Sequence, residues 1–176
     1  MYLGPSRIDV VRRAGIGAPL SMAAIARQVR RGLDASGAPA PSSVTVVLTD
    51  DTELADLNRE HMGHRGPTDV LSFPMLEPDR FDRTGTTPRQ ARRAGSARGE
   101  PRLHIGDIAI SVERAAEQAA QGRGGQTGDV RWSVADELRL LVTHGTLHLC
   151  GWDHAEPAEE AAMRALERRL LGQPEG

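Results

Sequence analysis

The chain has 176 residues and a formal net charge of −2, with 39% hydrophobic and 3% aromatic residues. This length predicts a single domain over residues 1–176, large enough to bury a core. The only cysteine, Cys150, excludes an internal disulfide and fits a reducing compartment. The apolar runs are too short to cross a bilayer and the N-terminus has no signal-peptide pattern, so we expect a cytoplasmic protein with no membrane partner.

The segment 79–102 is unusually basic. It holds seven arginines against three carboxylates, a balance of +4, which leaves −6 for the rest of the protein. Because it is rich in small and polar residues and has no apolar period, we predict a mobile loop over 79–102. This loop is either a contact surface for phosphates or a solvated insertion without a role, and the sequence leaves both alternatives open.

In chain order, the pattern predicts a strand over 8–11, a helix capped by Ser21, a strand over 44–49, a helix opened at Asp50, strands over 69–73 and 104–110, a helix from Ser111 to about 121, and helices over 133–150 and 157–172. Strands and helices in this order predict an α+β fold, with a small mixed sheet of about four strands covered by helices. In such a layout the helix 133–150 packs on the sheet, and the strand 69–73 borders the cleft beside it.

Three histidines stand within eleven residues near the end of the predicted helix 133–150. His144 and His148 are four apart and therefore share a helix face, while Gly151 can end the helix and bring His154 back as a third ligand. Three protein ligands and an open position are typical of a catalytic zinc. Isolated histidines are usually structural, but this spacing favours a metal site at the helix end.

The same spacing occurs in metzincin peptidases, which place a glutamate directly after the first histidine as general base. Here that position is Gly145. Cys150 is two residues after His148, on another side of the helix, and is expected to be a small buried residue instead of a ligand. His61, His64 and His104 have no ligand spacing and are interpreted as structural or surface residues.

Four motifs in this order resemble the YbeY endoribonuclease family: Leu57-Asn58, the run Pro67 to Pro74, the run Gly106 to Ser111, and the run His144 to His154. The resemblance covers about residues 44–172. It implies a zincin-like α+β domain with one Zn²⁺ per chain, bound by His144, His148 and His154. It also implies a role in ribosomal RNA maturation, at the 3′ end of the small-subunit RNA, and in ribosome quality control, with ribosomal RNA and the small ribosomal subunit as partners and no DNA.

One departure from the family concerns an arginine expected four positions after the Asn of the Leu57-Asn58 pair. Here that position is Met62, and Arg59 and Arg65, three residues to either side, are the candidates to supply a positive charge. Asp153, next to His154, either accepts a hydrogen bond from the ring nitrogen with which a histidine does not bind the metal, and so orients that ring, or stabilises a turn.

Other polar and sulfur-containing residues near the motifs have simpler interpretations. Asp69 and Asp107 are expected at strand ends or caps, Ser72 fills a strand position, and Met163 lies on the apolar stripe of the last helix.

The catalytic group would be a zinc-bound water, acting as a hydroxide nucleophile or as the base for a 2′-hydroxyl of RNA. The sequence does not choose between these two routes. Three functions remain: a zinc-dependent endoribonuclease specific for single strands, a ribosome assembly factor with a structural zinc, and, disfavoured by Gly145, a zinc peptidase.

Overall fold

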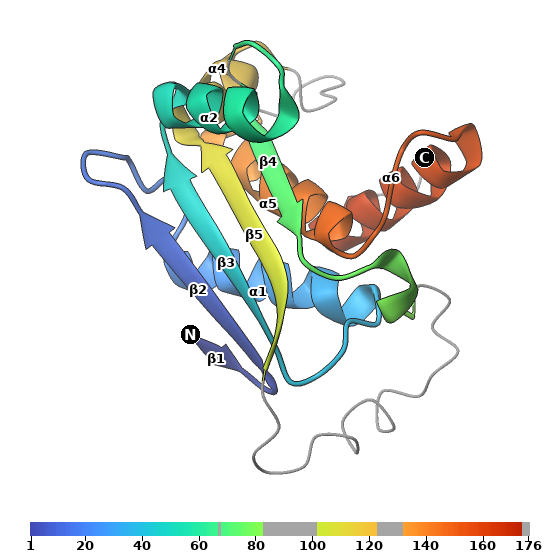
Figure 1. The fold of residues 1–176 in the computed structure, drawn as a ribbon. Helices are drawn as coiled ribbons and strands as arrows, with labels where there is room; N and C mark the ends of the chain where they lie inside the picture. The colour runs from blue at the N-terminus through green and yellow to red at the C-terminus, as the bar shows by residue number, and fades with distance from the viewer. Residues whose placement is uncertain (67, 83–101, 123–131, 174–176) are drawn as a thin grey trace.

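The sheet that carries the fold has five strands in the order β1-β2-β3-β5-β4 (Figure 1). The computed structural model describes residues 1–66, 68–82, 102–122 and 132–173. The strands are β1 (Tyr2–Leu3), β2 (Ser6–Arg12), β3 (Ser42–Thr49), β4 (Val70–Pro74) and β5 (Leu103–Ser111). The central strands β2, β3 and β5 are parallel, whereas β1 and β4 run antiparallel to their neighbours.

The prediction of an α+β fold with a mixed sheet is confirmed, but the number of strands is five and not four. The additional strand, β1, consists of two residues that pair with Ser6 and Arg7 of β2. Two residues are too few to show an alternating pattern, so only the pairing in three dimensions reveals this strand.

The helices in the described part of the chain are α1 (Met22–Ala35), α2 (Asp51–Leu57), α4 (Val112–Ala120), α5 (Val134–Leu149) and α6 (Pro157–Leu171), with a π-helical turn η1 (Asn58–Met62) and a 3₁₀ turn η2 (Pro78–Arg80). Ser21, Asp50 and Ser111 cap their helices as predicted, because each side chain accepts the backbone N–H three residues later. None of these helices is long and apolar enough to span a membrane.

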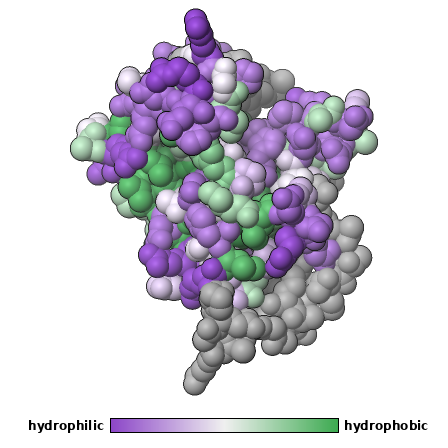
Figure 2. Space-filling view, in the orientation of Figure 1, coloured by the Kyte–Doolittle hydropathy of each residue, from purple (hydrophilic) through white to green (hydrophobic). Residues whose placement is uncertain are grey.

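Helices α1 and α5 pack on one face of the sheet (Figure 1). Strand β3 shows why, since its buried Val44, Val46 and Leu48 alternate with partly exposed residues. The other face is turned to the viewer in Figures 1 and 2, with α2 near its upper end, and hydrophilic and hydrophobic residues both contribute to it (Figure 2).

Helix α6 packs on α5 through a small apolar cluster of its own. Met163, Leu166 and Leu170 of α6 surround Leu147 of α5, and all four are at most 7% exposed. The interpretation of Met163 as a core residue is confirmed. This cluster fixes α6 beside the helix that carries His144 and His148.

Most of the predicted basic loop, residues 83–101, lies outside the described residues, as does most of the glycine-rich segment that follows α4. At the start of the loop, η2 leads to Phe81, which is 6% exposed and belongs to the main core. The mobile loop over 79–102 stays a prediction, and the described residues add that its first part forms η2 and is held at the core by Phe81.

Candidate metal centre

Helix α5 has a well-defined start. Ser133 and Asp136 form a reciprocal capping box, in which the serine hydroxyl accepts the N–H of Asp136 and the aspartate accepts the N–H of Ser133. From there the helix runs for four turns against the sheet, and His144 and His148 project from one side of its last two turns.

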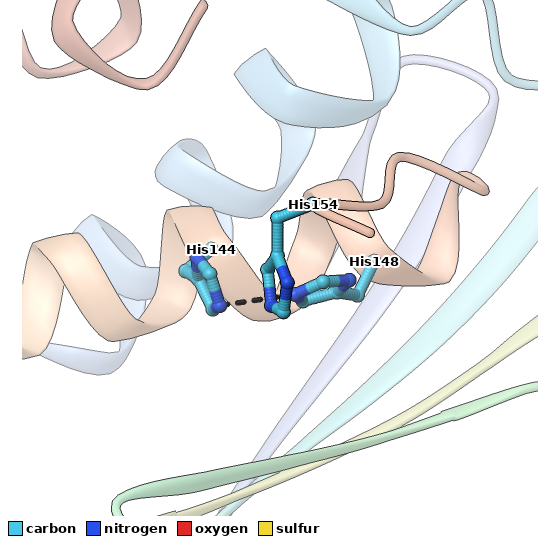
Figure 3. A group of neighbouring side chains, drawn as sticks. All are labelled: His144, His148 and His154. Atoms are coloured by element: carbon cyan, nitrogen blue, oxygen red, sulfur yellow. Dashed lines mark hydrogen bonds between the residues drawn. The ribbon is translucent and has the colours of Figure 1, made fainter. Parts of the chain in front are cut away.

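The end of α5 is a Schellman motif. The N–H of Trp152 donates to the carbonyl oxygen of Leu147 at 3.1 Å, and the N–H of Gly151 donates to that of His148 at 3.0 Å. Gly151 has φ +76°, and a Cβ there would lie 2.7 Å from Pro78 Cβ, so both backbone and space require glycine. This turn reverses the chain and brings His154 over the helix, as Figure 3 shows.

The three imidazoles converge on one point (Figure 3). Each offers a ring nitrogen, and the three nitrogens lie within 4.8 Å of one another. Nε2 of His144 and Nε2 of His148 are 3.0 Å apart. His144 and His148 are partly buried, whereas His154 is exposed at the mouth of the site. This group of three histidines could hold a metal ion.

The second nitrogen of each helical histidine faces an oxygen acceptor. Nδ1 of His148 is 2.9 Å from the carbonyl oxygen of Trp152, and Nδ1 of His144 is 2.7 Å from Oε1 of Glu167 on α6. Because a carbonyl and a carboxylate oxygen can only accept, both Nδ1 atoms carry the proton when the rings are neutral. Each Nε2 then presents a lone pair.

When neither Nε2 is protonated, their two lone pairs 3.0 Å apart repel each other unless a proton or a metal cation lies between them. Burial first, and then the neighbouring His144, lower the pKa of His148 and so favour its neutral, metal-binding form. The donor set, its protonation and its spacing therefore fit a metal ion bound through three imidazoles.

The histidines line a cleft of about 840 Å³ whose opposite wall is formed by β4 and the residues that follow it. The prediction that this strand borders the cleft is confirmed. Three carboxylates also line the cleft, those of Asp69, Glu77 and Asp153, and among the described lining residues there is no arginine.

Gly145 makes the close approach of α5 and β4 possible. A Cβ at this position would lie 2.9 Å from Ile108 Cγ2, 3.1 Å from Ser72 Oγ and 3.2 Å from Val70 Cγ2. The position thus faces the sheet, and a side chain there meets packed atoms. Ser72 Oγ donates to the carbonyl oxygen of Gly145 at 3.1 Å, which agrees with its interpretation as a strand residue.

The arginines expected near the site do not line the cleft in the described residues. Arg59 pairs with Asp56 at 2.8 Å on an exposed surface, and Arg65 is exposed in the segment before β4. Met62, at the position of the family's arginine, ends η1 and is 42% exposed. A catalytic role for Arg59 or Arg65 remains a prediction that the geometry does not support.

Asp153 lies at the cleft, and its carboxylate accepts the backbone N–H of its neighbour His154 at 2.7 Å. This contact corresponds to the turn-stabilising alternative. The carboxylate that contacts a helical histidine is instead that of Glu167, which the sequence analysis did not identify. No pattern links Glu167 to a histidine 23 residues earlier, because the contact depends on how α6 docks on α5.

The remaining candidates have structural surroundings. Asp69 accepts the N–H of Val70 and the amide of Gln118, both at strand or helix ends. Asp107 pairs with His104 at 2.9 Å on the sheet face opposite α5. Cys150 is fully buried, and this burial raises the pKa of its thiol to about 12.

His61 and His64 belong to exposed parts of the chain. His61 makes an edge-on contact with the ring of Phe73, with ring centroids 5.2 Å apart. Neither belongs to the group of three that could hold a metal, as the sequence analysis expected.

Known proteins resemble this chain over most of its length. A profile of the family Endoribonuclease YbeY matches residues 18–175. Proteins named Endoribonuclease YbeY are 41% identical in Salinispora tropica (88% of this chain and 88% of the relative), 42% in Symbiobacterium thermophilum (84% and 82%) and 40% in Thermobifida fusca (93% and 91%).

The solution structure of TM1509 from Thermotoga maritima covers 94% of this chain and 90% of its own, at 21% identity and a TM-score of 0.50, which supports the fold. With a family profile over 158 positions, from residue 18 to residue 175, and relatives near 40% identity that match over more than four fifths of both chains, the chain belongs to the endoribonuclease YbeY family.

Proposed function

We propose that this protein is a zinc-dependent endoribonuclease that cleaves single-stranded regions of ribosomal RNA precursors, at the 3′ end of the small-subunit RNA, and contributes to ribosome quality control in the cytoplasm. The observation that carries the proposal is the pair of Nε2 atoms 3.0 Å apart in His144 and His148, with His154 beside them and both helical Nδ1 atoms facing acceptors. Family membership supplies the reaction class.

Zinc is the metal that this donor set favours, because three neutral imidazoles with an open position are typical of catalytic zinc sites. When bound, zinc supplies Lewis acidity toward a water molecule and a phosphoryl oxygen. The residues of the chain hold the ligands in place: the turn at Gly151 positions His154, and the carbonyl of Trp152 orients His148.

RNA binding requires positive charge near a cleft that carries Asp69, Glu77 and Asp153. A bound zinc offsets part of this negative charge. The largest further source in the sequence is the basic segment, whose arginines Arg83 to Arg98 lie outside the described residues. We propose that these arginines contact RNA phosphates and that the small ribosomal subunit is the partner on which the enzyme acts.

A second candidate function is a ribosome assembly factor in which the metal is mainly structural. The observation in its favour is that no arginine lines the described part of the cleft and that Met62 replaces the arginine expected from the family. A peptidase is disfavoured, because the position of the peptidase base, Gly145, faces the sheet.

Cleavage and metal content together test the proposal. Purified protein should contain one zinc per chain and cleave a precursor containing the small-subunit RNA 3′ end, while casein stays intact and a chelator stops the reaction. His148→Ala should lose both zinc and cleavage. His104→Ala, which changes a histidine on the opposite sheet face, is the matched control and should retain both. Zinc-dependent hydrolysis of casein with intact RNA would refute the proposal, and cleavage of neither substrate would favour the assembly factor.

The role of the basic segment has its own test. Because Phe81 belongs to the core, the test substitutes arginines that follow it in the chain and deletes no residue. Changing Arg83, Arg89, Arg92, Arg93 and Arg98 to serine should weaken RNA binding and flatten the slope of log affinity against log salt by about 0.7 per lost contact. An unchanged slope would mean that phosphates are bound elsewhere.

A further inference from the structure

Glu167 is a carboxylate on α6 that reaches a histidine of α5. Its Oε1 lies 2.7 Å from Nδ1 of His144, and its side chain is 13% exposed against 31% for the histidine. At this distance the carboxylate oxygen and the imidazole nitrogen form a hydrogen bond, and the glutamate side chain is largely shielded from water. The apolar cluster around Leu147 holds the two helices together on either side of it.

We infer that Glu167 is the positioning residue of the metal centre: it fixes the tautomer and the ring orientation of His144. This inference rests on the proposed zinc site. A neutral imidazole carries its proton on either nitrogen, and only the form protonated at Nδ1 leaves Nε2 free for a metal. The carboxylate of Glu167 selects that form, because it can accept the Nδ1 proton and offers none in return. It also makes Nε2 a better donor.

The comparison with His148 shows why a side chain is needed at His144. His148 is oriented by the carbonyl of Trp152, which belongs to the same turn as the ligand and is further fixed by the indole N–H bond to Ser36 at 3.1 Å. His144 lies one helical turn before His148, and its Nδ1 faces Glu167 instead of a backbone carbonyl. Its acceptor comes from α6, so the last helix of the chain is part of the metal centre.

Helix α6 offers a matched control for the charge of Glu167. Glu160 lies two turns earlier and pairs with Arg164 at 2.6 Å. Glu160, Glu167 and His144 line a second pocket of about 670 Å³. Replacing either glutamate by glutamine removes one negative charge near the site at constant size. Only Glu167→Gln changes the acceptor of His144, because a glutamine amide can donate to Nδ1 as well as accept from it.

Zinc affinity, measured by competition with a chromogenic chelator, is the first readout. Glu167→Gln should weaken zinc binding about 10- to 100-fold. Losses of this size are typical when a group that hydrogen-bonds to a metal ligand is replaced. Glu160→Gln should stay within about 2-fold of the wild type, since it leaves that acceptor in place. Equal affinities of Glu167→Gln and wild type would overturn the inference, and so would an equal loss in both variants.

The second readout needs neither metal nor a folded Glu167 variant. In metal-free wild-type protein labelled with ¹⁵N-histidine, at a pH where the rings are neutral, His144 should be protonated at Nδ1, with its signals assigned through His144→Gln. Protonation at Nε2 would overturn the inference even if Glu167→Gln failed to fold. Absence of zinc binding in the wild type would instead refute the proposed function, and the tautomer would still decide the role of Glu167.

Discussion

Replacing Gly145 tests whether the first position after His144 can hold a peptidase base. The added Cβ would lie 2.9 Å from Ile108 Cγ2, well inside the 3.5–4.0 Å at which carbon atoms pack favourably, and 3.1 Å from Ser72 Oγ. Overpacking of this kind costs about 1–3 kcal/mol, and the better helix propensity of alanine returns about 1 kcal/mol. Gly145→Ala should therefore lower the free energy of unfolding by about 0–2 kcal/mol.

Gly145→Glu should be much more harmful, because the rest of the side chain must also enter the contact between α5 and β4. Bringing a carboxylate into this packed region without a partner adds a desolvation cost of several kcal/mol. We expect a total loss above about 3 kcal/mol, or separation of α5 from β4. Even where it folds, the variant should not hydrolyse casein, because the new carboxylate starts from the sheet side of the helix.

Urea unfolding of the metal-free proteins gives these free energies. Ala162→Glu on the exposed side of α6 is the control for adding a glutamate to a helix, and it should change stability by less than about 0.5 kcal/mol. If Gly145→Glu were as stable as Gly145→Ala, the tight contact between α5 and β4 would be refuted. If it gained zinc-dependent casein hydrolysis, position 145 would face the metal cleft and not the sheet.

Three further predictions follow from single contacts. Gly106→Ala should prevent soluble expression or lower the free energy of unfolding in urea by more than about 3 kcal/mol. Gly106 has φ +151°, and a Cβ there would lie 2.2 Å from the carbonyl oxygen of Phe73. Stability near that of the wild type would contradict this contact. Hydrogen bonds from Arg13 hold the pKa of Glu53 below its usual 4.5, so the stability that Glu53 contributes is complete above pH 4.5 and lost as pH falls through the lowered pKa. The stability difference between wild type and Glu53→Gln should therefore shrink from pH 7 to pH 3, and a constant difference would refute it. Cys150, buried and with its pKa raised to about 12, should react with iodoacetamide only after unfolding, and fast labelling of the native protein would contradict its burial.

The sequence alone determined the parts of this protein that depend on neighbours along the chain. The caps at Ser21, Asp50 and Ser111 and the turn at Gly151 are local, because a side chain or a left-handed glycine satisfies backbone groups three to five residues away.

The grouping of the three histidines could be predicted for the same reason. Two of them share a helix face and the third follows one turn, so the spacing of His144, His148 and His154 already specifies where their ring nitrogens meet.

Only the tertiary structure decided which residues hydrogen-bond to those histidines and which residues line the cleft beside them. Glu167 meets His144 because α6 docks on α5 through apolar contacts, and no period in the sequence encodes that angle. Arg59 pairs with Asp56 on the surface, and neither Arg59 nor Arg65 lines the described part of the cleft, so their catalytic role stays a prediction. Local patterns specify ligands within one turn of a helix, whereas the groups that orient ligands and line a cleft come from distant segments and are placed by packing.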